Sequence, residues 1–104
     1  AAALRQPEQP RGGTGGAGQE APRRHVVEIR GFEFHPAALS VAAGDTIVWV
    51  NQDAVPHTAT SGEGKWDSGS IATQESWSLV AGPGDGGEYI CDFHPTMTGQ
   101  LTVR

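Results

Sequence analysis

Soft metal-binding side chains are scarce in this chain, which contains one cysteine and one methionine among its 104 residues. A single cysteine excludes an intramolecular disulfide framework, and it also excludes a binuclear metal centre bridged by two thiolates. No run of apolar residues approaches the length of about 20 that a transmembrane helix needs. Lys and Arg number seven against twelve Asp and Glu, which gives a net charge of −5. Nucleic acid is therefore not an expected partner.

The sequence divides into a tail and one domain. Residues 1–24 contain five Gly, three Pro and four Arg, with Leu4 as the only large apolar residue. Such a segment cannot bury enough apolar surface to offset the entropy of ordering it, so we predict a disordered tail or linker. It is either a linker without function or a tether to a membrane anchor or another domain. Residues 25–104 then form the folded domain, which carries a charge of −7 and is long enough for a single core.

Residues 25–104 show the pattern of short strands. The segment Asp45–Asn51 is the strongest, because it is rich in β-branched and aromatic residues. Apolar and polar residues alternate with period two around Glu33 and along residues 75–80. Clusters of Gly, Pro and Asp, such as residues 82–87, mark the turns. The pattern predicts an all-β, Greek-key β-sandwich of about seven to eight strands, with no long helix.

The few soft donors are concentrated in one pattern. The segment Cys91-Asp-Phe-His94-Pro-Thr-Met97 holds the thiol, an imidazole and the thioether, and Pro56-His57 lies upstream of it. A trigonal His₂Cys plane with a weak axial Met is the geometry of blue-copper electron-transfer sites. Taken alone, each of these residues would more often have an ordinary structural role, in the core or at the surface, than bind a metal. Together they predict one type 1 copper ion held by His57, Cys91, His94 and Met97, with His94 and Met97 on a loop that begins at Cys91.

The chain resembles the cupredoxins, and most of all the short-loop amicyanins, with plastocyanin and pseudoazurin as more distant relatives. The resembling segments are Gly44–Asn51, Val55–Thr58, Trp66–Gly69, Glu88–Gly99 and Leu101–Val103. The Cys-x₂-His-x₂-Met spacing is typical of amicyanins. The resemblance implies a monomer that carries single electrons between larger redox proteins by weak, transient contact, outside the cytoplasm and normally in the periplasm. The chain starts without a signal peptide, so we expect a mature or trimmed form.

Residues next to the ligands depart from the family pattern. In the family the first ligand His is usually followed by Asn and the Cys by Ser or Thr, whereas this chain has Thr58 and Asp92. We expect the Thr58 hydroxyl to donate to the Asp92 carboxylate, the alternative being a water-exposed Asp92. We also expect the Thr58 N–H to donate to the Cys91 thiolate. Phe93, at a position where amicyanin-like loops often have Pro, could supply a second N–H to the sulfur and raise the reduction potential.

His94 is the expected point of electron entry and exit, because the family exposes the ring edge of this ligand inside an apolar patch. The candidates for the surrounding residues are Pro56, Pro95, Phe93 and Val55. Small apolar patches with polar rims are typical of weak redox encounters. The acidic residues that could steer a basic partner are Asp53, Asp92, Asp67 and Glu63. Such charges more often serve solubility than docking.

Three classes of function fit the ligand set: an electron carrier, a copper storage or delivery protein, and an enzyme domain. The paired His-Cys-His signature of multicopper oxidases is absent, and four histidines are too few for a trinuclear cluster. We therefore expect no enzymatic activity. Carrier and delivery protein differ in whether the bound copper cycles reversibly between its oxidation states. A plain immunoglobulin-like adhesion sandwich would not need these ligands.

Overall fold

The computed structural model describes residues 21–104, and within that range it contains eight strands and no helix. The strands are β1 (Arg24–Arg30), β2 (Glu33–His35), β3 (Ala38–Val41), β4 (Thr46–Asn51), β5 (Thr60–Ser61), β6 (Ser76–Val80), β7 (Gly87–Cys91) and β8 (His94–Val103). The described part therefore has no helix that could cross a membrane. β1 begins one residue before the predicted domain boundary, and most of the predicted tail lies outside the described residues.

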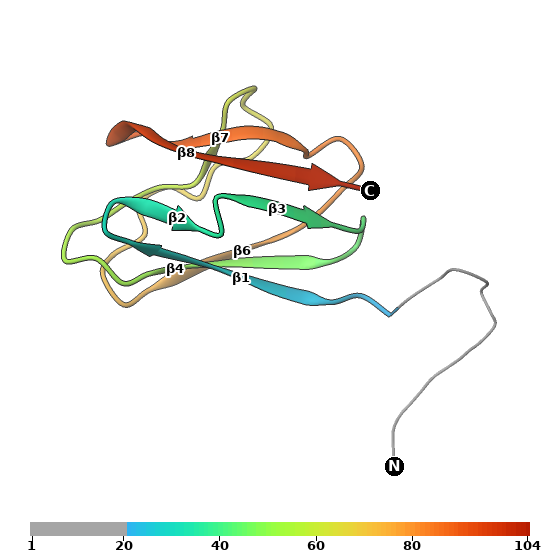
Figure 1. The fold of residues 1–104 in the computed structure, drawn as a ribbon, viewed down its shortest axis with the longest axis horizontal. Coiled ribbons are helices and arrows are strands. Elements are labelled where there is room, and N and C mark those ends of the chain that lie inside the picture. The colour runs from blue at the N-terminus through green and yellow to red at the C-terminus, as the bar shows by residue number, and fades with distance from the viewer. Residues whose placement is uncertain (1–20) are drawn as a thin grey trace, which may run out of the picture.

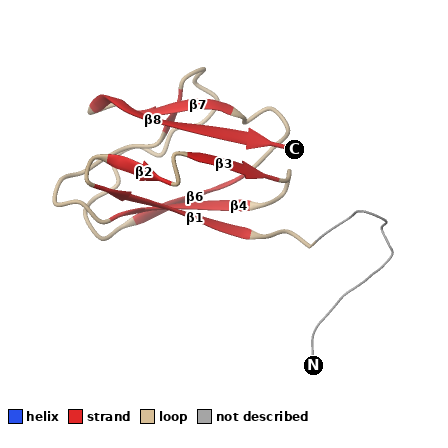
Figure 2. Cartoon of the chain, in the orientation of Figure 1, coloured by secondary structure: helices blue, strands red, loops and turns tan. Residues whose placement is uncertain are grey.

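The strands form two four-stranded sheets that pack face to face (Figures 1 and 2). One sheet has the order β2-β1-β4-β6, and the other has the order β3-β8-β7-β5. β1 pairs in parallel with β4, and β3 pairs in parallel with β8, whereas the remaining pairs are antiparallel. The predicted all-β sandwich is confirmed.

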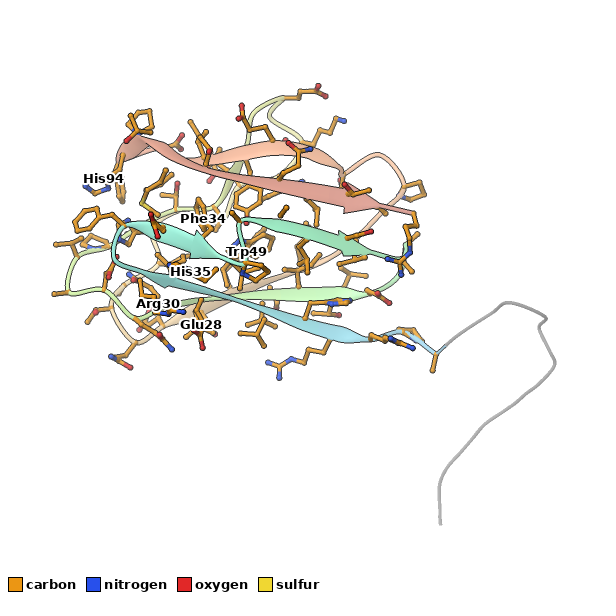
Figure 3. The ribbon with its side chains drawn as sticks, in the orientation of Figure 1. Glu28, Arg30, Phe34, His35, Trp49 and His94 are labelled. Atoms are coloured by element: carbon orange, nitrogen blue, oxygen red, sulfur yellow. The ribbon has the colours of Figure 1, made fainter. Side chains whose placement is uncertain are left out.

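The core lies between the two sheets and is largely aromatic. Trp49, on the central strand β4, is fully buried and lies in the interior in Figure 3. Its ring contacts the rings of Trp66, Trp77 and Tyr89, with centroids 5.3, 5.6 and 5.5 Å away. Burial of each such side chain stabilises the fold by about 1.5–3 kcal/mol. This cluster anchors the strands that carry the functional residues.

A two-residue turn joins β7 to β8 and shapes the motif near the C-terminus. Cys91, the last residue of β7, pairs with His94, the first residue of β8. His94 and Met97 were expected on a loop, but the structure places both on β8. Side chains alternate between the two faces of a strand, and Met97, Gly99 and Leu101 are accordingly the buried residues of β8. The hairpin thus directs the Met97 side chain inward.

Candidate metal centre

Two imidazoles and the thiol converge at one end of the sandwich. His57 Nδ1 lies 3.6 Å from Cys91 Sγ, and His94 Nδ1 lies 3.8 Å from the same sulfur. One donor atom from each of the three residues lies within 4.8 Å of the others. Figure 3 shows His94 at the end of β8 opposite the C-terminus. Residues 34 positions apart in the chain are therefore brought together by folding.

The three side chains come from separate elements and are held firmly. His57 lies in the segment between β4 and β5, where its backbone exchanges two hydrogen bonds with Ile71, at 3.2 and 2.7 Å. His57 and Cys91 are completely buried, whereas His94 is partly exposed. Met97 follows His94 by three residues on β8 and is buried. A thiol, two imidazoles and a neighbouring thioether are the donors that suit a copper ion, so the residues present fit the predicted metal.

The sulfur of Cys91 accepts one backbone hydrogen bond. The Thr58 N–H donates to it at a distance of 3.3 Å, as the sequence had led us to expect. Among the described residues no hydrogen bond runs from the Phe93 N–H to this sulfur, contrary to the second expectation. Phe93 occupies the tight turn between β7 and β8. The rise in reduction potential that was expected from a second amide donor therefore loses its structural basis.

The two ligand segments are bridged, but through different atoms from those expected. The Asp92 N–H donates to the Thr58 hydroxyl at 2.8 Å, so this hydroxyl acts as an acceptor. The Asp92 carboxylate instead lies 3.2 Å from the hydroxyl of Thr60, which is 2.9 Å from the Thr58 hydroxyl. Sequence reasoning missed Thr60. Its spacing of two from Thr58, which places both side chains on one face of an extended segment, was the available signal.

Asp53 is the second residue whose role differs from the expectation. It was considered for steering a partner, but its carboxylate faces inward and lies 2.9 Å from His57 Nε2. Partial burial opposes ionisation of Asp53, but hydrogen bonds from the Phe32 and Gly31 amides and from His57 outweigh it, so the pKa of this carboxyl lies below its ordinary value. A carboxylate behind a metal-binding His fixes the tautomer and the orientation of the ring. Its position four residues before His57 was the signal in the sequence.

The residues expected to form an apolar surface near His94 are exposed in the structure. The four residues expected there, Val55, Pro56, Phe93 and Pro95, are all exposed. Phe32 joins them: it is 48% exposed, and its ring contacts the rings of both His57 and His94. No sequence pattern pointed to this fifth residue, because Phe32 lies in the turn between β1 and β2 and is more than 20 residues from either His. The acidic side chains Asp67, Asp92 and Glu63 are exposed.

Comparison with known proteins decides the family. The profile of the Cupredoxin-like domain family matches residues 2–103. The chain belongs to this family. This cupredoxin is 29% identical over 84 residues to the amicyanin of Paracoccus denitrificans, covering 76% of the present chain and 64% of the relative. It is also 29% identical over 84 residues to the plastocyanin of Scenedesmus fuscus, covering 68% and 86%. The resemblance stated from the sequence is confirmed.

Solved structures of copper proteins have a similar fold. The crystal structure of amicyanin from Paracoccus versutus superposes with a TM-score of 0.65 and 25% identity, covering 78% of this cupredoxin and 81% of that chain. A copper-containing nitrite reductase from Thermus scotoductus superposes with a TM-score of 0.68 at 24% identity. That match covers 83% of this cupredoxin but 23% of the reductase, and it supports the fold alone. The chain spans 64% of the length of the Paracoccus amicyanins that it matches.

Proposed function

We propose that this cupredoxin carries single electrons between larger redox proteins, using one type 1 copper ion held by His57, Cys91, His94 and Met97. The observation that carries the proposal is the convergence of the Cys91 sulfur with His57 Nδ1 and His94 Nδ1, at 3.6 and 3.8 Å. Copper in such a site supplies a Cu(II)/Cu(I) couple. The chain itself would supply no catalytic group, so we propose a carrier and not an enzyme.

The protein would keep the ligands in one arrangement in both oxidation states. His57 and Cys91 are fully buried, and neighbouring backbone is tied by the Thr58 N–H to the sulfur and by the Asp92 N–H to the Thr58 hydroxyl. Side chains held in this way cannot rearrange freely when an electron arrives. A small rearrangement lowers the barrier to electron transfer, and a ligand set held by several elements at once favours it.

The electron would enter and leave at His94, the partly exposed imidazole of the group. The apolar surface around it would consist of Phe32, whose ring contacts His94, and of the exposed residues Val55, Pro56, Phe93 and Pro95. Such a patch desolvates readily and allows weak contacts that form and break quickly. We propose that redox partners dock here and that the cupredoxin acts as a monomer in the periplasm or a similar compartment. The segment before β1 would be a tether or a linker.

Copper loading tests the proposal. The copper-loaded protein is expected to show one copper per chain, an intense visible copper–thiolate charge-transfer band, and reversible one-electron voltammetry. Cys91→Ala, which removes the thiolate, should lose the band and the reversibility, whereas His35→Ala, which removes a histidine outside the group, should keep both. A stoichiometric copper complex without reversible voltammetry would contradict the carrier function and would favour copper storage or delivery.

A further inference from the structure

The turn between β1 and β2 has a conformation that its sequence does not favour. Arg30 pairs with Glu33, so Gly31 and Phe32 form a two-residue hairpin loop. Both have left-handed backbones, with φ of 61° for Gly31 and 59° for Phe32. Glycine adopts this conformation freely, but it is a genuine outlier for a bulky residue. An unfavourable backbone that the fold nevertheless maintains indicates a role for the side chain that it presents.

The Phe32 ring contacts both imidazoles of the metal centre. Its centroid lies 5.2 Å from that of His57 and 4.8 Å from that of His94, with interplanar angles of 89° and 87°. Both contacts are edge-to-face, which is a favoured arrangement of aromatic rings. Figure 1 shows the β1–β2 turn at the same end of the sandwich as the start of β8. Because Phe32 is half exposed, its ring lies between solvent and the two histidines.

One carboxylate holds both the turn and the first ligand. The Gly31 N–H donates to Asp53 Oδ1 at 2.7 Å, and the Phe32 N–H donates to Asp53 Oδ2 at 2.9 Å. Successive backbone N–H groups in a turn form a concave site for an anion. The same Oδ2 lies 2.9 Å from His57 Nε2. The Asp53 N–H in turn donates to Asn51 Oδ1 at 2.9 Å, which fixes the carboxylate relative to β4.

We propose that Asp53 and Phe32 are positioning residues for the metal centre, an inference that rests on the proposed copper function. By accepting a hydrogen bond from His57 Nε2–H, Asp53 leaves Nδ1 unprotonated on the side of Cys91. By holding the turn in its left-handed form, Asp53 also keeps the Phe32 ring against His94. A single carboxylate thus orients both imidazoles, and the ring that it holds in place limits the access of water to the site.

The test compares the full chain with Phe32→Gly, Asp53→Ala and the double variant, with Phe32→Leu and Asp53→Asn as conservative controls. The measurements are Cu(I) competition with a chelator, EPR of the Cu(II) form and voltammetry. Phe32→Gly should leave the thermal stability of the metal-free protein unchanged or higher, because glycine suits the turn. It should nevertheless change the EPR spectrum and lower the reduction potential, because water stabilises the more highly charged Cu(II) form. Phe32→Leu, which keeps an apolar side chain there, should retain most of the potential.

Asp53→Ala should weaken Cu(I) binding about 10- to 100-fold, as removal of a carboxylate behind a metal-binding His does. The double variant isolates the contact with His57, because a turn with two glycines no longer depends on the carboxylate. It should bind Cu(I) about tenfold or more weakly than Phe32→Gly. If Asp53→Ala fails to fold, the Cu(I) affinity of the double variant is compared with that of Phe32→Gly. Asp53→Asn, which keeps one acceptor oxygen for the imidazole N–H, is then compared with the wild-type protein.

The failure of this inference can be told apart from the failure of the proposed function. If the wild-type protein forms the charge-transfer band while Phe32→Gly and the double variant keep its EPR spectrum, potential and Cu(I) affinity, Asp53 and Phe32 merely stabilise a turn and the inference is wrong. If the wild-type protein forms no copper–thiolate band at all, the proposed function itself fails.

Discussion

Replacement of Gly99 by alanine is expected to destabilise the sandwich at the hairpin that carries Cys91 and His94. Gly99 pairs with Tyr89 across β7 and β8. A Cβ at position 99 would lie 2.3, 2.5 and 2.6 Å from Cζ, the hydroxyl oxygen and Cε1 of Tyr89. All three distances are far shorter than van der Waals contact, so the tyrosine ring would have to move.

The Tyr89 ring has little room to move. It is buried, and its centroid lies 4.7 Å from that of Phe34, 5.5 Å from that of Trp49 and 5.5 Å from that of Trp66. Overpacking in a core costs about 1–3 kcal/mol, and a ring enclosed by three others belongs at the upper end of that range. A loss of about 3 kcal/mol is a large part of the roughly 5–15 kcal/mol that stabilises a small domain. It lowers the melting temperature by on the order of 10 °C or more.

Urea unfolding of the metal-free protein, followed by tryptophan fluorescence, measures this loss. Gly84→Ala is the matched control, because no atom lies within 4 Å of the added Cβ and the backbone there is not left-handed. The reasoning is refuted if Gly99→Ala unfolds at the same urea concentration as Gly84→Ala. The metal centre should also be affected, since the pairing of Tyr89 with Gly99 belongs to the same ladder as the pairing of Cys91 with His94.

Three further predictions follow from hydrogen bonds and pKa values. Hydrogen bonds from the Arg23 amide, the His25 ring and the Ala42 amide lower the pKa of Asp45 from 3.8 to about 2. The ionised carboxylate should therefore stabilise the fold above pH 3.8, with the contribution lost as the pH falls towards about 2; urea midpoints of Asp45→Asn should lack this acid-dependent loss. Burial raises the pKa of Tyr89, the single tyrosine, to about 12. Its tyrosinate absorbance should appear near that pH in the folded protein and near 10 in urea, and stability should fall as the pH rises between these values; identical titrations in both states would contradict the burial argument. Thr58→Ala removes the acceptor of the Asp92 N–H and should cost about 1 kcal/mol in chemical unfolding, whereas Thr58→Ser, which keeps the hydroxyl, should cost less; equal losses for the two variants would exclude the hydrogen bond as the cause.

Sequence patterns correctly indicated most of the strands, because period-two alternation and β-branched residues report directly on a half-buried extended backbone. They were less accurate at the metal motif. His94 and Met97 were assigned to a loop that begins at Cys91, whereas the structure continues β8 back to His94. The pairing of Cys91 with His94 across a two-residue turn depends on β7, and such pairing is not visible in a local pattern.

The sequence by itself determined the chemistry of the site and the fold class. One thiol, one imidazole and one thioether lie within seven residues of the sequence, so the chain itself keeps these donors near one another. Only the tertiary structure decided what surrounds them: the carboxylate of Asp53 behind His57, the hydroxyl of Thr60 beside Asp92, and the ring of Phe32 against both imidazoles. Apart from Asp53 and His57, which share the segment between β4 and β5, these contacts join segments that are far apart in the chain, so they depend on how the sheets pack and not on the spacing of residues along one strand.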